Sequence, residues 1–330
     1  MRVLVTGGAG FIGSHYVRQA ISGAYPALAD AEIVVLDKLT YAGSETNLTP
    51  VAGNPRLRFV RGDICDGALV ADLMRGTDLV MHFAAESHVD RSILGSADFV
   101  LTNVLGTQTL LQAACDAEVG KFVHVSTDEV YGSIESGSWT EEHVLEPNSP
   151  YSASKASSDL LARSFGRTYG LPVCVTRCSN NYGPHQFPEK VIPLFVTNLL
   201  DGKPVPLYGD GLNVRDWLHV DDHCHGLQLV AEGGRPGEIY NIGGGTELTN
   251  RELTEKLLAA AGCGWEMVNP VADRLGHDRR YSVDITKIAS ELGYAPRVDF
   301  ATGLADTVRW YAENRAWWEP LKDRAALTEG

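Results

Sequence analysis

The chain of 330 residues lacks long hydrophobic runs, paired cysteines and an excess of positive charge. Its longest apolar stretches, such as residues 79–85, are far shorter than the roughly 20 residues that span a bilayer, so we expect no membrane association. The six cysteines include no C-x-x-C pair, which favours reduced thiols in a cytoplasmic protein over a disulfide framework. With 42 acidic and 28 basic residues the net charge is −14, which argues against nucleic-acid binding.

The first half of the chain alternates short apolar runs with longer helical patterns. Strands that are apolar throughout are typical of a parallel sheet covered on both faces. Strands and helices joined by short links indicate right-handed βαβ units. We therefore predict an α/β fold with a doubly wound parallel (Rossmann) sheet, with strands at 2–6, 32–37, 57–61, 78–84, 121–126 and 172–177 and helices at 11–22, 67–75, 103–117 and 151–169.

The second half is less regular and richer in glycine and proline clusters. It contains one further strand pattern at 238–242 and helical patterns at 222–231, 250–261, 285–292 and 301–314. We predict a smaller, partly interleaved C-terminal α/β domain. The predicted boundaries are 1–180, together with about 216–242, for the sheet domain and 181–330 for the second domain. The polar tail after Trp318 is expected to fray.

A glycine-rich turn lies between the first strand and the first helix. Gly7, Gly10 and Gly13 have the G-x-x-G-x-x-G spacing that permits a tight turn and close approach of the backbone to a pyrophosphate at a helix N-terminus. An ordinary turn is the alternative, but the strand before it and the helix after it favour a dinucleotide site. Asp37 ends the second strand, where an acid binds a ribose 2′-hydroxyl and repels a 2′-phosphate. The pattern therefore favours NAD over NADP.

Two charged residues near Asp37 are less clear. Lys38 follows directly and weakens the preference for NAD slightly. Asp63 ends the third strand, where it lies either next to the adenine or at the N-cap of the following helix. The sequence favours neither role for Asp63.

The strand at 121–126 and the helix after it carry a candidate catalytic group. Tyr151 and Lys155 are four residues apart, so they share one face of a helix. An ammonium near a phenol lowers the pKa of the phenol, and such a tyrosine can accept a hydroxyl proton as hydride leaves the same carbon. Thr127, at the end of the strand, can bind that hydroxyl. The alternative is a solvated surface pair, which the upstream glycine turn makes the weaker interpretation.

Asp128 and Glu129 directly follow Thr127 at the edge of the sheet where ligands bind. Hydride transfer alone needs neither acid. A neighbouring acid and base are what removal of a carbon-bound proton with loss of water requires. The alternative is a solvated turn acid and a helix cap, and both carboxyls can act only if the backbone turns sharply there.

The combined motifs resemble the dTDP-glucose 4,6-dehydratases, a family of extended short-chain dehydrogenases/reductases, over roughly residues 1–320. The matching segments are GGAGFIGS, DKLTYAG, HFAAESHVDRS, TDEVYG, YSASKA, NNYGPHQFPEKVIP, PLYGDGLNVRDWLHVDDH and DRLGHDRRYSVD. The resemblance implies a lyase (hydro-lyase) that uses NAD to turn dTDP-glucose into dTDP-4-dehydro-6-deoxyglucose in deoxysugar biosynthesis. Sibling 4-epimerases share the glycine turn and the Tyr–Lys pair but lack the Asp–Glu pair. A 4-epimerase and a noncatalytic NAD-binding protein remain the alternatives.

The resemblance also implies a role for each motif residue. Tyr151, supported by Lys155 and Thr127, would be the base for oxidation at carbon 4, Glu129 would remove the carbon 5 proton, and Asp128 would protonate the departing 6-hydroxyl. Further cofactor contacts would come from Phe11, Ile12, Asp37, Lys38, Leu39, Thr40, Asp63, Ile64, Ala84, Ala85, Ser87, Thr102 and Asn181. Substrate contacts would come from Ser87, Thr127, Asn180, Lys190, Val191, Pro206, Tyr208, Arg215, Asn250, Arg274, His277 and Tyr281. A homodimer through the helices at 103–117 and 151–169 follows by analogy.

Two other clusters of the second half allow competing interpretations. Four arginines lie near the glycine-rich loops: Arg215, Arg274, Arg279 and Arg280. Such side chains either clamp a diphosphate or form surface ion pairs, here with Asp216 or Asp278. The family pattern favours Arg215 and Arg274 as the diphosphate ligands. The segment HVDDHCH places three histidines at spacings that can hold zinc, namely His219, His223 and His225. Asp221 or Asp222 fits better as the N-cap of the helix at 222–231, so we predict no metal site.

Overall fold

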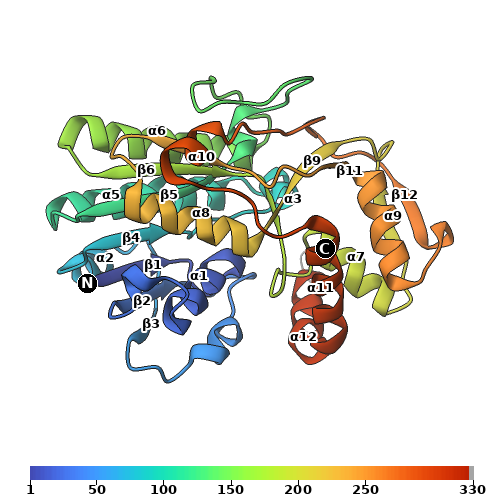
Figure 1. The fold of residues 1–330 in the computed structure, drawn as a ribbon, viewed down its shortest axis with the longest axis horizontal. Helices are drawn as coiled ribbons and strands as arrows, with labels where there is room; N and C mark the ends of the chain where they lie inside the picture. The colour runs from blue at the N-terminus through green and yellow to red at the C-terminus, as the bar shows by residue number, and fades with distance from the viewer. Residues whose placement is uncertain (327–330) are drawn as a thin grey trace.

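A seven-stranded parallel sheet organises the first half of the chain in the computed structural model, which describes residues 1–326 (Figure 1). The strand order is β10-β6-β5-β4-β1-β2-β3, and every neighbouring pair is parallel. This order is that of a doubly wound dinucleotide-binding sheet, so the predicted fold class is confirmed. The strands are β1 (Arg2–Thr6), β2 (Glu32–Asp37), β3 (Leu57–Arg61), β4 (Leu79–His82), β5 (Lys121–Thr127), β6 (Val173–Cys178) and β10 (Ile239–Ile242).

Helices cover both faces of this sheet because its strands are apolar on both sides. Val3 and Val5 of β1 pack into one core with helices α1 (Phe11–Ser22) and α8 (Val220–Gly233). Leu4 points the other way into a second core. That core is completed by α2 (Gly67–Met74), α5 (Thr107–Asp116) and α6 (Pro150–Tyr169).

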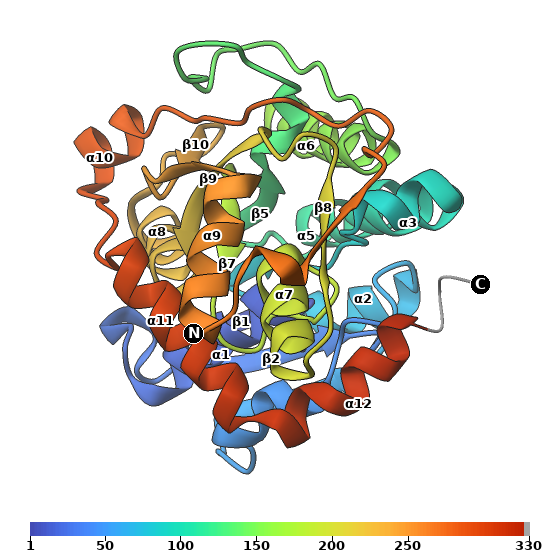
Figure 2. The same ribbon diagram turned by 90° about the vertical axis from the view of Figure 1, so that its right-hand side faces the viewer.

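The second half forms two small sheets and a helical layer at the edge of the large sheet (Figure 2). A three-stranded sheet has the order β11-β9-β7, and a two-stranded sheet pairs β12 with β8. Helix α8 and strand β10 return to the large sheet, so the two halves are interleaved. The elements are β7 (Asn180–Tyr182), α7 (Val191–Leu200), β8 (Val205–Tyr208), β9 (Val214–His219), β11 (Glu247–Thr249), α9 (Asn250–Ala261), β12 (Val268–Val271), α10 (Thr286–Leu292), α11 (Phe300–Glu313) and α12 (Arg315–Ala326).

Short helical segments connect the strands of the first half. The helix predicted at 103–117 begins earlier, because the π-helical segment η3 (Val100–Gly106) runs directly into α5. The remaining segments are η1 (Pro26–Leu28), η2 (Glu45–Val51), α3 (Val89–Leu94), α4 (Ala97–Phe99), η4 (Asp128–Tyr131) and η5 (Trp265–Met267). Within residues 1–326 no helix is long and apolar enough to cross a membrane.

The C-terminal segment differs from the prediction. The chain after Trp318 is helical as far as Ala326, because Trp318 is buried in the core of the second half and α12 is anchored along its length. Trp317 donates a hydrogen bond to Asn47, and Lys322 donates one to Asp201. The expected fraying is therefore wrong up to Ala326, and residues 327–330 lie outside the described part of the chain.

Candidate active site

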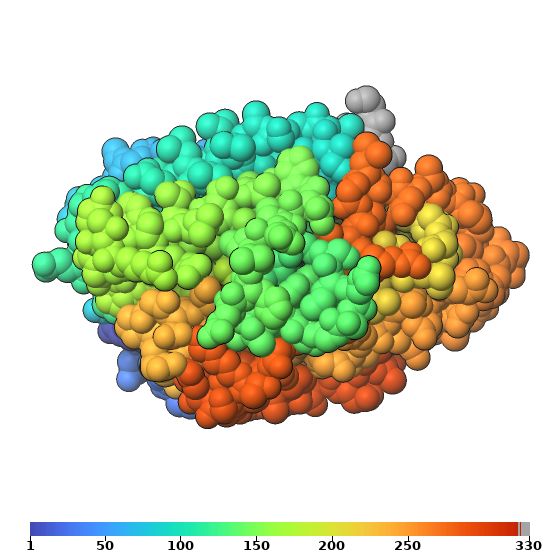
Figure 3. All heavy atoms as spheres, turned by 90° about the horizontal axis from the view of Figure 1, so that it is seen from above, coloured from blue at the N-terminus to red at the C-terminus, as the bar shows by residue number. Residues whose placement is uncertain are grey.

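A cavity of about 770 Å³ lies at the carboxyl edge of the large sheet, between the two halves of the chain. Every residue predicted for catalysis, cofactor or substrate lines this cavity except Leu39. Backbone hydrogen bonds join the segment after η4 to the second half of the chain, from Ile134 to Arg280 and from Trp139 to Ser282. Figure 3 shows this segment, in bright green, against the orange chain of the second half. The structure thus brings the predicted residues together where open α/β sheets bind ligands.

The glycine turn forms a cradle that suits a dinucleotide. Gly7 has a φ of 70°, and a methyl group there would lie 2.5 Å from the backbone nitrogen of Ala84. A methyl group at Gly13 would overlap the carbonyl oxygen of Gly7. Gly10 caps α1 without a side chain, so the first N–H groups of this helix face the cavity. These uncapped donors and the positive end of the helix dipole fit the pyrophosphate of NAD.

Replacing Gly7 by alanine should remove bound NAD and lower the stability of the protein. The left-handed φ and the overlap with Ala84 together cost about 1–3 kcal/mol. Differential scanning fluorimetry and the NAD content of the purified protein measure the two losses. Gly23→Ala is the matched control, because Gly23 has a φ of 85° but nothing within 4 Å of the added methyl group. Equal loss of NAD in both variants would contradict the assignment of the cradle.

Asp37 lines the cavity near the glycine turn and is held by the backbone. Its two carboxylate oxygens accept hydrogen bonds from the N–H groups of Leu39, at 2.8 Å, and Ala9, at 2.9 Å. Burial raises the pKa of Asp37, and these two hydrogen bonds oppose that rise. Leu39 itself adopts a left-handed φ of 57° and does not line the cavity.

Asp63 and Lys38 form an ion pair of 2.7 Å and also line the cavity. Asp63 does not cap the following helix, because Asp66 accepts the hydrogen bonds of the first turn of α2. The N-cap interpretation of Asp63 is therefore wrong. Lys38 is neutralised by Asp63, which removes the feature that weakened the preference for NAD.

The acid pair lies on a tight turn that keeps both carboxyls inside the molecule. Thr127 ends β5, and its hydroxyl accepts a hydrogen bond from the N–H of Glu129 at 3.2 Å, which caps the 3₁₀ turn η4. Asp128 is 1% exposed, and Glu129 lines the cavity. Oδ2 of Asp128 is buried without a hydrogen-bond partner among the described residues. The solvated-turn interpretation is therefore wrong, and this oxygen is left for a ligand hydroxyl.

The surroundings of the two acids raise the pKa values of both, and unequal numbers of cations oppose the rise. Burial, together with the charges of Glu129 and Asp216, holds the pKa of Asp128 well above its usual range. Burial also raises the pKa of Glu129, but this rise is opposed by three cations, Lys190, Arg215 and Arg274. Only one cation, Arg215, opposes the rise at Asp128, and neighbouring carboxyls in unequal surroundings can divide into a proton donor and a proton acceptor. Asp128 is suited to the donor role and Glu129 to the acceptor role.

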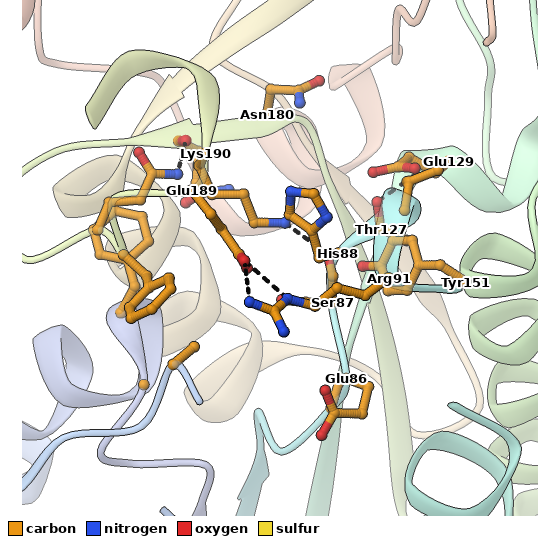
Figure 4. Close-up of a pocket in the computed structure, with 18 of the residues that line it drawn as sticks. Glu86, Ser87, His88, Arg91, Thr127, Glu129, Tyr151, Asn180, Glu189 and Lys190 are labelled. Carbon is orange, nitrogen blue, oxygen red and sulfur yellow. Dashed lines mark hydrogen bonds and ion pairs between the residues drawn. The ribbon is translucent and has the colours of Figure 1, made fainter. Parts of the chain in front are cut away.

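Tyr151 and Lys155 lie one turn apart on α6 and are both buried. The helix is started by a capping box of Ser149 and Ser152, which places Tyr151 at the cavity beside Thr127 and Glu129 (Figure 4). The pKa of Tyr151 is raised by burial and by nearby carboxyls, so the expected lowering by Lys155 is wrong for this structure. The ammonium of Lys155 instead donates a hydrogen bond to the carbonyl of Val125 at 2.8 Å, and burial lowers its own pKa.

Two arginines from the second half line the cavity, and each has partners within the protein. Arg215 stacks 4.1 Å from the ring centre of Tyr281 and donates to the carbonyl of Asp278. Arg274 forms a two-pronged ion pair with Asp90, with N–O distances of 2.5 and 2.7 Å.

The other two arginines form ion pairs outside this lining. Arg279 pairs with Asp210 at 2.9 Å, and Arg280 pairs with Glu247 at 2.8 Å. The predicted ion-pair partners, Asp216 and Asp278, were wrong, because both carboxylates bind other groups inside the protein. Asp216 accepts from Ser179 and two backbone N–H groups, and Asp278 accepts from Tyr281 and Asn148.

The sequence interpretation missed an ion pair at the cavity, between Arg91 and Glu189. Arg91 is paired with Glu189 at 2.8 Å and lies 3.6 Å from the ring centre of Tyr41. Figure 4 shows Glu189 and Lys190 facing Thr127, Glu129 and Tyr151 across the pocket. Arg91 lies within the motif HFAAESHVDRS and Glu189 within NNYGPHQFPEKVIP. Their positions within these family motifs could have marked them as cavity residues from the sequence.

The three histidines of the segment HVDDHCH have separate partners. His219 caps α8 by accepting a hydrogen bond from the N–H of Asp221 at 3.2 Å. The prediction that Asp221 or Asp222 is the N-cap is therefore wrong. His223 is buried against the side chain of Asn181 at 2.9 Å, and His225 contacts Arg297. No group of three metal-binding side chains converges within residues 1–326.

Comparison with known proteins agrees with this geometry. The sequence model of the family described as GDP-mannose 4,6 dehydratase matches residues 4–307. The dTDP-glucose 4,6-dehydratase of Streptomyces antibioticus is 67% identical over 327 residues, which cover 99% of this chain and 97% of the relative. Similar proteins of Streptomyces niveus and Streptomyces griseus are each 61% identical, with 98% of this chain covered.

Solved structures show the same fold with ligands. The crystal structure of the dTDP-glucose 4,6-dehydratase DesIV of Streptomyces venezuelae, with NAD and dTDP bound, has 68% identity and a TM-score of 0.96, covering 97% of this chain and all of that one. The NAD complex of the Bacillus anthracis dTDP-glucose 4,6-dehydratase has 48% identity and a TM-score of 0.90, covering 97% of this chain and 99% of that one. The chain therefore belongs to the family of the dTDP-glucose 4,6-dehydratases.

Proposed function

We propose that this chain is a hydro-lyase that converts dTDP-glucose into dTDP-4-dehydro-6-deoxyglucose with NAD as its cofactor. The observation that carries the proposal is the acid pair of Asp128, which is buried, and Glu129, which is half-buried; both line the cavity that also holds Tyr151 and the glycine cradle. Epimerisation at carbon 4 uses a base and a dinucleotide but no such pair. The identity to dTDP-glucose 4,6-dehydratases over nearly the whole chain supports the same substrate.

The side chains divide the proton transfers of this reaction among themselves. NAD, when bound, accepts hydride from carbon 4 and returns it to carbon 6. Tyr151 takes the proton of the 4-hydroxyl, with Thr127 binding that hydroxyl and the ammonium of Lys155 one helical turn away. The new ketone acidifies the hydrogen at carbon 5, which Glu129 removes. Asp128, which keeps its proton because of its raised pKa, donates it to the 6-hydroxyl so that water leaves.

Incubation with dTDP-glucose in heavy water tests the proposal. The proton that Glu129 removes from carbon 5 is replaced from solvent, so the keto product should carry deuterium at carbon 5. Nuclear magnetic resonance and mass spectrometry of the product locate the label. A 4-epimer formed without loss of water would overturn the proposal in favour of an epimerase. Binding of NAD with no turnover of any sugar nucleotide would favour a noncatalytic protein.

The substrate subsites extend from the catalytic group into the second half. We assign the sugar to Ser87, Thr127, Asn180, Lys190 and Val191, and the nucleotide and diphosphate to Pro206, Tyr208, Arg215, Asn250, Arg274, His277 and Tyr281. All of these line the cavity. The residue division 1–180 with 216–242 for NAD and 181–330 for the nucleotide-sugar is proposed on the same basis.

We also propose a homodimer in the cytoplasm. Large apolar side chains are exposed on adjoining helical segments of the first half, which would be buried if two copies paired there: Leu94, Val100, Leu101, Leu105 and Leu160. These residues lie on α3, η3 and α6, which partly coincide with the predicted pairing helices. Sedimentation velocity distinguishes a dimer from a monomer, and cell fractionation tests the location.

A further inference from the structure

Asp159 is a buried carboxylate that does not line the cavity. It follows Tyr151 by two helical turns and Lys155 by one, so the three side chains lie along one face of α6. Asp159 is fully buried, and its Oδ2 accepts a hydrogen bond from Nε of Arg177 at 2.9 Å. Its Oδ1 lies 3.2 Å from Nε2 of His124 on β5. A carboxylate so far from solvent requires compensation, and Arg177 on β6 supplies it.

Arg177 continues this contact toward the acid pair. Its guanidinium lies 4.7 Å from the ring centre of Tyr131, which is the last residue of η4. Tyr131 is fixed on its other side, where its hydroxyl donates to the side chain of Asn241 at 2.9 Å and its ring stacks on Trp139. Asp159 is thereby connected through Arg177 and Tyr131 to the turn that carries Asp128 and Glu129.

The same carboxylate acts on Lys155. Burial lowers the pKa of the Lys155 ammonium, and the charge of Asp159 is the main influence that opposes this fall, followed by Cys178. Cys178 is a weaker source of negative charge than Asp159, because burial raises the pKa of its thiol. Burial lowers the pKa values of His124 and His82, and the charge of Lys155 lowers them further.

We propose that Asp159 is a positioning residue for both halves of the reaction, since it places a negative charge next to Lys155 and, through Arg177 and Tyr131, fixes the turn that carries Asp128 and Glu129. The proposal rests on the proposed function, because it assigns Asp159 a part in the oxidation and dehydration described above. Asp159 itself touches neither substrate nor cofactor. A purely structural buried ion pair would stabilise the fold without affecting the titration of Lys155.

The test is the pH profile of dTDP-glucose turnover in Asp159→Asn. Without the carboxylate Lys155 loses its proton at lower pH, so the buried cation one helical turn from Tyr151 is lost at lower pH. The alkaline limb of kcat should move down by about one pH unit, with a roughly tenfold loss of kcat on that limb and little change in KM. A looser η4 should also slow dehydration relative to oxidation, so NADH should accumulate transiently.

Two further variants keep the test decisive. Asp159→Asn with Arg177→Met removes both buried charges, so it folds even if the single variant does not, and it should keep the shifted limb because the charge beside Lys155 is still missing. Asp222→Asn is the control: Asp222 is a buried carboxylate that accepts two backbone hydrogen bonds away from Lys155. It should lower the melting temperature and leave the limb unmoved.

The outcomes separate the two proposals. Wild-type protein that does not turn over dTDP-glucose would defeat the proposed function itself. Active wild-type protein together with a folded double variant that has the wild-type limb and accumulates no NADH would overturn the role of Asp159 alone.

Discussion

Glu129→Gln should oxidise dTDP-glucose and then stop before water is lost. The amide cannot accept the carbon 5 proton, while Tyr151, Lys155 and the glycine cradle remain intact. Loss of a general base typically costs 10²–10⁴ in rate, so we expect product formation to fall by about that factor. Rapid mixing with substrate followed by the absorbance of NADH should show reduced cofactor that persists, which a wild-type cycle does not leave behind.

The control for this variant is Glu135→Gln, the same change a few residues further along. Glu135 is exposed and does not line the cavity, so turnover should remain normal. If Glu129→Gln makes product at the wild-type rate, Glu129 is not the base. If it shows neither product nor NADH, the variant has lost oxidation as well, and the separate roles of Glu129 and Tyr151 are contradicted.

The elements of the first half were largely predicted from local sequence patterns. Strand β1 and helix α1 have the predicted bounds, because alternate residues of β1 enter two cores and the glycine turn leaves only one way to continue into the helix. Asp37 was predicted at the end of its strand and Asp128 at the ligand-binding edge of the sheet, and both line one cavity with Gly10 because parallel strands end at one edge.

The second half was harder because its elements carry weaker signals. Helix α7 begins Val191-Ile192-Pro193-Leu194-Phe195-Val196 and is apolar on nearly all sides, so it shows no helical periodicity. Strand β9 contains Arg215 and Asp216, two buried charged residues that mask a strand pattern. Both elements are defined by tertiary packing more than by local sequence.

Interactions between distant residues were beyond sequence reasoning. Arg274 pairs with Asp90, which is 184 residues away, and Arg91 pairs with Glu189, which is 98 residues away. The pKa of Tyr151 was predicted in the wrong direction for the same reason. The helical spacing placed Lys155 nearby, but the extent of burial and the carboxyls around the phenol are properties of the assembled cavity.

Tyr151→Phe should abolish the first step, and it should do so without any accumulation of NADH. The ring is retained, so the packing against Phe99 persists, but no group remains at this position to take the 4-hydroxyl proton. We expect kcat to fall by about 10²–10⁴ with bound NAD still oxidised. Tyr169→Phe, at the exposed end of the same helix, is the matched control and should behave as wild type.

Both catalytic variants should lose the product, but they should leave the bound cofactor in opposite redox states. Glu129→Gln leaves NADH because oxidation precedes the proton removal that it blocks, whereas Tyr151→Phe leaves NAD because oxidation never begins. NADH in Tyr151→Phe would mean that another residue accepts the hydroxyl proton, and Thr127 would then be the first to examine, since it lies beside Tyr151 and its hydroxyl lowers the raised pKa of that phenol. Absence of NADH in both variants would mean that oxidation and deprotonation are concerted, a result that the separation of Tyr151 and Glu129 into two roles does not allow.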